Sequence, residues 1–399
     1  MTYDLVVVGS GAAGLIGAIQ AARNSKNVLL LEQLPKLATK LKATGGGRCN
    51  LTNTLDNESF MKSFGKNGRF MRDALNVMKY TDLILFFKEL GVETHIPDGF
   101  RVFPKTHSSN TIIDALKKEL TNQNITVQNN SKVIAVDKNN SIFHIKTLTK
   151  IYSGKNILLA TGGLGYPKLG ATGEGLEIAK TLGHKVTELY PAMMPLYTKE
   201  TWQGNCTADT ISKVEIKVNL PKKKLQKLKA TGDLIFTKKG LRGPVILDFA
   251  RELTPFLKDF NEVPILISLT KMNENEILTF IKKYNSLKGL LPYSVINELC
   301  KICKINPDTK YKNLQGKSKD KLLKLLAWTP FTIIGHDGFN QAMITRGGIN
   351  LKEIHPSTME SKLVKGLYFA GEIMDIDGPC GGYNLQWSFS SGYLAGSSI

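Results

Sequence analysis

The sequence predicts an α/β protein in which a Rossmann-like domain is interrupted by an inserted β-rich domain and a small helical subdomain. Three observations predict this organisation. A G-x-G-x-x-G motif joins an apolar run to a helical pattern within residues 5–23, prolines punctuate short alternating segments over 188–270, and helical periodicity fills 271–334. We therefore expect a discontinuous first domain, residues 1–187 and 335–399, with residues 188–334 inserted.

The composition is that of an ordinary globular protein. Of 399 residues, 42% are hydrophobic and 22% are charged, which excludes a disordered or collagen-like chain. The length predicts two or three domains, and five widely spaced cysteines do not form a disulfide framework. No apolar run approaches the roughly 20 residues of a membrane helix, and no secretory signal is evident. We expect a cytoplasmic protein with no membrane span.

The first βαβ unit carries a dinucleotide-binding pattern. Residues 5–8 and 28–31 are short apolar runs typical of buried parallel strands, and residues 15–23 form the helical segment between them. The glycines permit a tight turn and close approach of a pyrophosphate to the helix N-terminus, and an acid after the second strand accepts from ribose. The predicted residues are Gly9, Gly11, Ala12, Ala13, Gly14, Glu32 and Gln33. A structural glycine turn is the alternative, and the motif alone does not separate FAD from NAD.

A second glycine-rich stretch follows at residues 45–50, where three glycines precede Arg-Cys-Asn. Such a loop can expose N–H groups along a cofactor, with an arginine as charge partner. A flexible turn is the alternative. The predicted cofactor-binding residues of this stretch are Lys40, Gly46, Gly47, Arg48, Cys49 and Asn50.

Residues 45–50, followed by Thr52-Asn53, resemble the signature of the HI0933-like flavoproteins. This family of bacterial FAD-binding oxidoreductases is also called the aminoacetone oxidase family and includes 3-dehydro-bile acid Δ(4,6)-reductase proteins. Residues 160–167 resemble its second glycine signature, although Gly165 stands where Ser is common. Residues 232–244 resemble its middle motif, with Lys238 and Arg242 in place of the usual His and Ser, and residues 347–396 resemble its closing block.

The resemblance implies FAD as the cofactor and a Rossmann-like fold of the glutathione-reductase type. In such flavoproteins a three-stranded meander passes the adenine, which is where we place Val133. An acid-bearing turn after a late strand is suited to the ribityl hydroxyls, and a glycine-initiated last helix to the flavin pyrimidine edge. A plain C-terminal packing helix is the alternative. The remaining predicted FAD residues are Ala160, Thr161, Gly162, Gly163, Gly371, Glu372, Asp375, Gly382, Tyr383, Asn384 and Leu385.

The rest of the first domain reads as alternating helices and strands. The segment 99–107 is either a substrate-side segment, as the resemblance implies, or a surface hairpin. Helices are expected over 73–90, 111–120 and 173–182, and strands over 125–127, 132–136, 143–148 and 157–160, with a turn at Asn139-Asn140.

The insert is expected to be β-rich first and helical afterwards. Strands are expected over 214–218, 233–237 and 264–269, and helices over 276–284, 293–303 and 320–328. The C-x-x-C at Cys300 and Cys303 falls inside the apolar pattern of one of these helices. It has no partner pair or histidine at metal spacing, so we expect no metal site.

The chemistry is expected to come from the flavin, with the protein supplying orientation and electrostatics. Tyr166, Arg101 and Tyr383 are the candidates for contact with a small-molecule substrate or its transferred proton, and packing or flavin contact is the alternative for each. Only one full G-x-G-x-x-G is present, so NADH or NADPH is expected to bind only transiently as reductant. The expected reaction is NAD(P)H-linked hydride transfer to a conjugated C=C. Amine oxidation with O2, an RNA-directed flavoenzyme and a redox sensor remain alternatives.

The formal net charge of +19 is concentrated in the insert. Residues 213–324 hold 24 Lys or Arg against 11 Asp or Glu. The densest run, residues 222–229, is interrupted by Leu225 and Leu228 and has no interleaved aromatic residue, so stacking on single-stranded nucleic acid is not indicated there. We interpret the excess as a solvated lysine-rich surface and do not expect a nucleic-acid partner. An anionic substrate or polyanion is the alternative.

Overall fold

The computed structural model describes residues 1–399 and divides them into two compact units. Unit 1 comprises Met1–Tyr190 and Ile344–Ile399, and unit 2 comprises Pro191–Met343. The buried apolar residues likewise form two clusters, one inside each unit. The chain passes between the units at β10 (Tyr190–Ala192) and just before β17 (Ile344–Arg346).

Unit 1 is built on a seven-stranded sheet in the order β6-β2-β1-β9-β8-β7, with β18 also paired to β9. The pairs β6–β2, β2–β1, β1–β9 and β9–β18 are parallel, while β7–β8 and β8–β9 form the antiparallel meander that the sequence predicts. The strands are β1 (Thr2–Val8), β2 (Val28–Leu31), β6 (Thr126–Gln128), β7 (Val133–Asn139), β8 (Ile142–Thr147), β9 (Ile151–Leu159) and β18 (Leu367–Phe369). The Rossmann-like architecture is confirmed.

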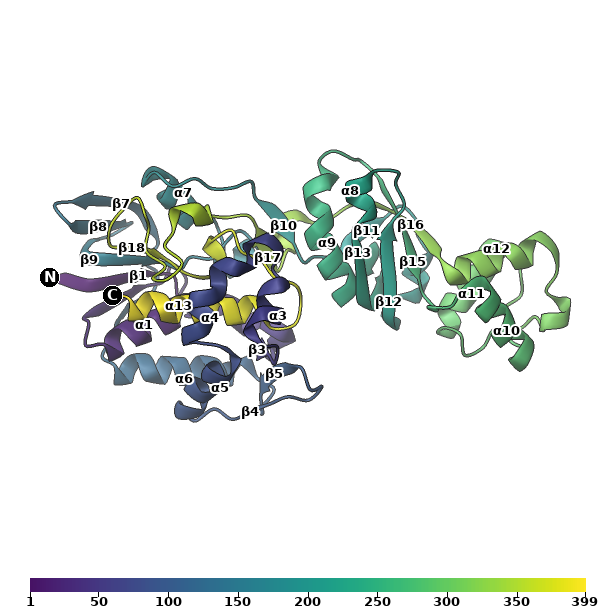
Figure 1. Cartoon of the computed structure of the whole chain (residues 1–399), viewed down its shortest axis with the longest axis horizontal. Helices are drawn as coiled ribbons and strands as arrows, with labels where there is room; N and C mark the ends of the chain where they lie inside the picture. Colours follow the sequence, from purple (N-terminus) through teal and green to yellow (C-terminus); the bar gives the residue numbers. More distant parts are fainter. The chain divides into compact units, whose positions relative to one another are not determined.

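Helices cover this sheet, and α1 packs along α13 (Figure 1). The helices of unit 1 are α1 (Ala12–Arg23), α2 (Thr39–Ala43), α3 (Asn57–Lys62), α4 (Arg72–Val77), α5 (Tyr80–Glu89), α6 (Ser109–Asn122), α7 (Glu174–Thr181) and α13 (Tyr383–Ser397). The helical pattern predicted over 73–90 is confirmed as two helices, α4 and α5, because Met78 leaves the helical conformation (φ −148°, ψ 75°) and Lys79 starts a new helix as its N-cap. The segment 99–107 contains β5 (Arg101–Pro104), which pairs with β3 (Thr52–Asn53) and β4 (Thr94–His95).

Unit 2 combines a closed six-stranded barrel with a group of helices. The barrel order is β11-β14-β13-β12-β15-β16, closed by the β11–β16 pair. Its strands are β11 (Leu196–Thr198), β12 (Thr210–Val218), β13 (Lys229–Thr237), β14 (Gly240–Arg242), β15 (Val263–Ser268) and β16 (Thr329–Gly335). Its helices are α8 (Lys223–Gln226), α9 (Pro244–Leu257), α10 (Glu274–Tyr284), α11 (Tyr293–Cys303) and α12 (Gly316–Ala327).

Two details of the insert differ from the sequence expectation. The segment expected to be only β-rich contains the 14-residue helix α9, with Pro244 at its first position and Pro255 inside it. The segment expected to be helical up to residue 334 ends in strand β16, which pairs with β15 and β11. Among the helices, none combines the length and the apolar character needed to cross a bilayer.

Candidate functional site

The first glycine loop is a tight turn between β1 and α1. Gly9 has φ +101°, and a Cβ there would lie 2.6 Å from the Ala160 carbonyl oxygen at the end of β9. A Cβ on Gly14 would lie 1.9 Å from the Gly9 carbonyl oxygen. Around Gly11, by contrast, no atom lies within 4 Å of the Cβ position. Gly11 is the N-cap of α1 and no side chain caps this helix, so its first-turn N–H groups suit an anion.

Glu32 closes β2 and is only 8% exposed. One of its oxygens accepts from the Ser10 N–H at 3.0 Å and from the Ser10 hydroxyl, and the other accepts from the Leu34 N–H at 2.8 Å. The carboxylate is therefore held rigidly, with lone pairs left over for a further donor. The neighbouring Gln33 side chain instead donates to the Gly170 carbonyl at 2.7 Å, so it fastens a loop.

The second glycine-rich loop adopts left-handed backbone at several positions. Gly46 and Gly47 have φ +66° and +85°, and no atom lies within 4 Å of their Cβ positions. Cys49 is fully buried at φ +59°, and burial raises the pKa of its thiol to about 12, so the thiol stays protonated at neutral pH. The Arg48 guanidinium lies 5.5 Å from the centre of the Phe103 ring.

This loop is tied to the N-terminus of α13 through Asn50. With its amide oriented by its hydrogen-bonding partners, Asn50 accepts from the Gly382 N–H at 2.9 Å and donates to the Thr52 carbonyl at 3.0 Å. Gly382 has φ +86°, and a Cβ there would lie 2.5 Å from the Thr52 backbone. Gly382 is the N-cap of α13, and no side-chain oxygen caps this helix.

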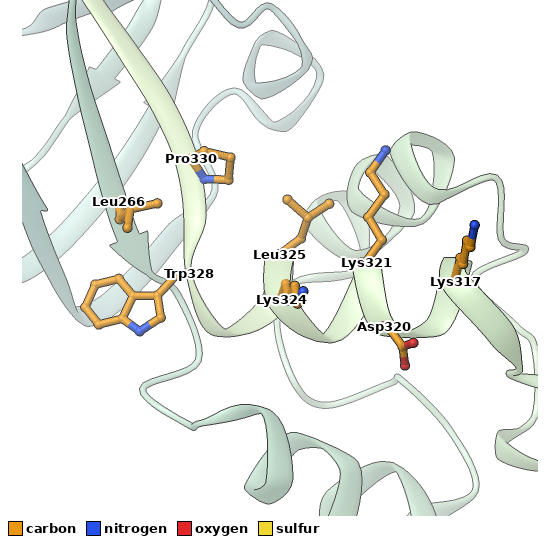
Figure 2. A pocket seen from close by; sticks show the side chains of 8 residues that line it. All are labelled: Leu266, Lys317, Asp320, Lys321, Lys324, Leu325, Trp328 and Pro330. Carbon is orange, nitrogen blue, oxygen red and sulfur yellow. The ribbon is translucent and has the colours of Figure 1, made fainter. Parts of the chain in front are cut away.

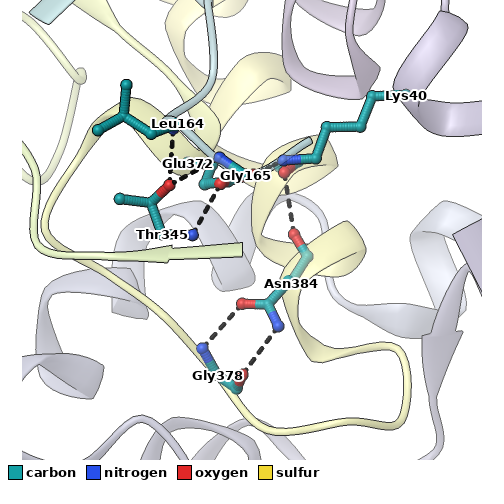
Figure 3. Close-up of polar contacts among 8 residues, drawn as sticks. Lys40, Leu164, Gly165, Thr345, Glu372, Gly378 and Asn384 are labelled. Carbon is teal, nitrogen blue, oxygen red and sulfur yellow. Dashed lines mark hydrogen bonds and ion pairs between the residues drawn. The ribbon is translucent and has the colours of Figure 1, made fainter. Parts of the chain in front are cut away.

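A polar network joins four distant segments of unit 1 (Figure 3). Lys40 forms an ion pair with Glu372 at 2.7 Å, and the other oxygen of Glu372 accepts from the Thr345 N–H at 2.9 Å. The Thr345 hydroxyl accepts from the N–H groups of Leu164 at 2.7 Å and Gly165 at 3.2 Å. Glu372 is thus already engaged by protein donors. Thr345 was not predicted, and no motif in the sequence indicates it.

The turn between β18 and α13 is fixed by its own side chains. The Asn384 amide accepts from the Gly378 N–H and donates to the Gly378 carbonyl, both at 2.8 Å (Figure 3). The Gly371 N–H donates to the Ser391 hydroxyl at 2.9 Å. Asp375 is half-buried, and burial, followed by the charge of Asp377, raises the pKa of its carboxyl.

The remaining predicted cofactor residues lie at the strand ends or in this turn. Thr161 and Gly162 follow β9; the Thr161 hydroxyl oxygen is buried with no hydrogen-bond partner, and the Cβ position of Gly162 has no atom within 4 Å. Gly163 packs against Thr345, where a Cβ would lie 2.3 Å from the hydroxyl oxygen. Val133 is buried at the start of β7. Ala12 and Ala13 are buried in the first turn of α1, and Leu385 is half-buried in that of α13.

The three candidates for substrate contact differ in their surroundings. Tyr166 has φ +58° and ψ 65°, a left-handed conformation that is costly for an aromatic residue and clusters at functional sites. Arg101 is exposed on β5 and forms an ion pair with Asp98. Burial raises the pKa of the Asp98 carboxyl, but hydrogen bonds, those from Arg101 included, outweigh this effect and lower the pKa to about 2. Tyr383 is 8% exposed and packs against Phe60 and Phe64.

These features fit an extended dinucleotide such as FAD. The open Cβ positions at Gly11 and Gly162 follow the adjacent parallel strands β1 and β9 at their carboxyl ends, where α/β sheets bind such ligands. The Cβ positions of Gly46 and Gly47 in the second glycine-rich loop are open too. Two helix N-termini carry no side-chain cap, and the buried Thr161 hydroxyl oxygen has no hydrogen-bond partner. No group of three or more His, Cys, Asp or Glu side chains is arranged to hold a metal ion.

Comparison with known proteins gives consistent matches over the whole chain. The model of a family described as HI0933-like protein Rossmann domain matches residues 3–398. The 3-dehydro-bile acid delta(4,6)-reductase of Clostridium scindens is 29% identical over 98% of this chain and 97% of its own length. The ribosomal RNA dihydrouridine synthase of Escherichia coli is 28% identical over 100% of this chain and 98% of its own length.

A solved structure has the same fold. The 3-ketosteroid delta1-dehydrogenase of Sterolibacterium denitrificans superimposes with a TM-score of 0.53 at 12% identity, covering 99% of this chain and 98% of that one. At this level of identity the likeness concerns the fold alone.

Proposed function

We propose, on the premise that this chain belongs to the family of HI0933-like Rossmann-domain proteins, that it reduces a carbon–carbon double bond conjugated with a carbonyl group. The chain is an FAD-dependent oxidoreductase, and the proposal adds the substrate class and the direction of electron flow. The substrate is a small organic molecule, and NADH or NADPH is the reductant, bound transiently.

One observation carries this proposal: two full-length relatives with different substrates have names that denote the same bond change. A 3-dehydro-bile acid delta(4,6)-reductase is named for double bonds conjugated with a ketone, and a dihydrouridine synthase for the double bond of a uracil ring, which is also conjugated with a carbonyl. In conjugate reduction of such a bond, hydride adds to the carbon remote from the carbonyl and a proton adds to the nearer carbon.

The cofactor roles follow from the geometry of unit 1. FAD, when bound, supplies hydride transfer at N5. We assign the pyrophosphate to the N-terminus of α1, the adenosine ribose to Glu32 and the adenine to the strand that begins at Val133. The N-terminus of α13 favours negative charge by on the order of 0.3–2 kcal/mol, which suits a reduced flavin. Because Glu372 is fixed by Lys40 and Thr345, we assign the ribityl contacts to Glu372 with Asp375.

For the proton we propose Tyr166, and for the substrate carbonyl Arg101. A phenol donates a proton without carrying a charge at neutral pH, and the strained backbone of Tyr166 holds it at the turn after β9. Asp98 fixes the Arg101 side chain on β5, and a guanidinium keeps further N–H donors for a carbonyl oxygen.

The test begins with the purified protein loaded with FAD, kept without air. NADH or NADPH is added while the flavin absorbance is followed, and a steroid enone of the bile-acid type is then added. We expect the absorbance to bleach and then to return, with a product two mass units heavier. The proposal is wrong if enones leave the reduced flavin unchanged while oxygen reoxidises it, or if amines bleach the oxidised flavin instead.

The variant Tyr166→Phe separates the proton-donor role from cofactor binding. We expect reoxidation by the enone to slow by about 100-fold, within the range for general acid catalysis, while bleaching by NADH or NADPH keeps its rate. Equal slowing of both half-reactions would assign Tyr166 to cofactor packing.

A second candidate substrate is the uracil ring within RNA. It is favoured by the Escherichia coli relative and by the concentration of positive charge in residues 213–324, since phosphate contacts dominate affinity for nucleic acids. Replacing the enone by a uridine-containing ribosomal RNA fragment in the same assay tests it, and dihydrouridine in the digested RNA is the expected product. Unchanged uridine with continued enone turnover would leave only the small-molecule substrate.

A further inference from the structure

We propose that a groove on unit 2, between α12 and the strands β15 and β16, binds single-stranded RNA through lysine–phosphate contacts and stacking on Trp328. The choice of RNA as occupant rests on the second candidate substrate above. The groove itself rests on the geometry of unit 2 alone.

The groove is a cavity of about 490 Å³ at the junction of barrel and helices (Figure 2). One wall is α12, which contributes Lys317, Lys321 and Lys324. The opposite wall belongs to the barrel and contributes Leu266 of β15 and Pro330 of β16. Asp320 is the one acidic residue in the lining, so the charge of the groove is positive.

The lysines lie on one face of α12 because their spacing follows the helical repeat. Lys317, Lys321 and Lys324 are separated by four and three residues, and Trp328 follows four residues later as the C-cap. The opposite face carries Leu322, Leu323 and Leu326, which are buried in the core of unit 2. Lys317 and Lys324 are therefore about 10 Å apart along the helix axis, which is longer than a single phosphate group and suits a polyanion.

Trp328 supplies the aromatic surface that the lysine run at 222–229 lacks. It is partly exposed at the end of α12, and the ammonium of Lys217 lies 3.8 Å from the centre of its ring. Lys217 pairs with Leu266 in the barrel, and Leu266 pairs with Pro330, so a fourth lysine borders the same wall. Aromatic side chains beside tracks of positive charge are how proteins bind single strands without reading sequence.

The sequence expectation against a nucleic-acid partner considered only the lysine run at residues 222–229. The run at 222–229 is dense along the chain, whereas the groove lysines are spread over α12 at helical spacing, and only the folded barrel brings Lys217 of β12 to Trp328. We take the groove to be the part of the basic insert with a specific partner.

The test measures binding of a fluorescein-labelled oligouridine of about 12 nucleotides, within the site size of single-strand binders, to the full-length FAD-loaded protein. The groove variant Lys317→Gln/Lys321→Gln/Lys324→Gln is compared with Lys223→Gln/Lys224→Gln/Lys227→Gln. The control makes the same charge change on the same unit, at lysines that are exposed around α8.

We expect the groove variant to bind at least about tenfold more weakly at low salt and to lose about 2 from the slope of log affinity against log salt, since each phosphate contact contributes about 0.7. The control should keep the slope within about 1. Equal losses in the two variants, or an unchanged groove variant, would overturn the proposal.

Stacking is tested separately at Trp328. We expect RNA to quench tryptophan fluorescence in the wild type, and the quenching to disappear in Trp328→Phe while affinity stays within about threefold. Trp328→Leu should weaken RNA binding by about tenfold and leave binding of heparin, which carries charge but no bases, unchanged. A parallel loss of RNA and heparin binding would refute the stacking role.

Reduction of the steroid enone serves as the independent reference for all these variants and should keep its wild-type rate. Loss of RNA binding with enone reduction intact supports the groove. RNA binding that is unchanged in the groove variants refutes the groove and leaves the proposed reaction standing.

Discussion

Individual glycines of the first loop differ in role: some are needed for the protein to fold, and others only for it to bind the cofactor. Gly11 has extended backbone (φ −70°, ψ −177°) that any residue adopts, and open space at its Cβ position. We predict that Gly11→Ala leaves the stability of the FAD-free protein unchanged and weakens FAD binding by about tenfold or more, about 1.4 kcal/mol, because the methyl group occupies the proposed pyrophosphate path. Chemical denaturation and FAD titration measure the two quantities.

Gly14→Ala is the matched comparison. Its Cβ would collide with the Gly9 carbonyl oxygen, so we expect the FAD-free protein itself to lose about 1–3 kcal/mol or more. A Gly11→Ala protein as unstable as Gly14→Ala would contradict the assignment of open space to the cofactor.

The cysteines give a second prediction at this scale. Burial raises the thiol pKa of Cys49 and Cys300 to about 12 and of Cys206 to about 11, and it also raises that of Cys303. At pH 8 we expect a thiol reagent to modify Cys380 alone in the native protein and all five cysteines after unfolding. Rapid native modification of a Cys380→Ser variant would contradict this.

The raised pKa values of these thiols also predict how the free energy of unfolding changes with pH. A thiol with a raised pKa in the folded state stabilises the protein fully below its unfolded value near 9, and this contribution is lost as the pH rises toward 12. The free energy of unfolding should therefore fall above pH 9, and less steeply in Cys49→Ala than in the parent protein.

Among the elements, α1 and α13 depend on contact between their backbones. A Cβ on Gly392 would lie 2.2 Å from the Ala13 carbonyl oxygen, and one on Gly396 would lie 2.4 Å from that of Gly17. We predict that Gly392→Ala lowers stability by about 1–3 kcal/mol and weakens FAD binding, because α13 must move and its N-terminus moves with it. Thermal unfolding and FAD titration measure this.

Ser397→Ala is the control on the same helix, at an exposed position in its last turn, and should behave as wild type. A stable Gly392→Ala protein with full FAD affinity would show that α13 tolerates displacement.

Elements formed by local patterns were predictable, and those decided by distant partners were not. The βαβ unit of β1, α1 and β2 was predicted to within three residues at each end. The strand β16 was missed because its pairing with β11, some 130 residues earlier, is invisible to periodicity. The helix α9 was missed because Pro244 was interpreted as punctuation between strands, although Pro is favoured at the first helical position.

The candidate site likewise combines residues that the sequence indicates with long-range contacts that it does not. Glycine permits the positive φ observed at Gly9, Gly46 and Gly47, so the sequence indicates where both loops turn. The Lys40–Glu372 ion pair joins residues 332 positions apart, and the sequence offered both residues without their pairing. Ser10, which holds Glu32, occupies a variable position of the G-x-G-x-x-G motif, and Thr345, which holds Glu372, lies in no recognisable motif.

For the whole molecule, the continuity of unit 2 gives a prediction. Pro191–Met343 is one stretch of chain with its own buried core and a closed barrel. Expressed alone, it should unfold cooperatively and carry no flavin absorbance, because the glycine loops all belong to unit 1. Circular dichroism during heating tests this, with Phe331→Ala, at a 1% exposed position, as a variant that should lose about 3–5 kcal/mol. A fragment without a cooperative transition would contradict independent folding.

The division of unit 1 into two chain segments also has a consequence for biosynthesis. Strand β18 and helix α13 are translated after the whole of unit 2. On the ribosome, the sheet of unit 1 therefore lacks β18 until unit 2 has been synthesised. At about 5–20 residues per second this delay is about 8–30 s. During that interval the face of α1 that later packs on α13 is uncovered, whereas unit 2 can already close its barrel. The nascent chain is therefore most exposed to chaperones and proteases at the first segment of unit 1, and a slow codon anywhere within residues 191–397 prolongs that exposure.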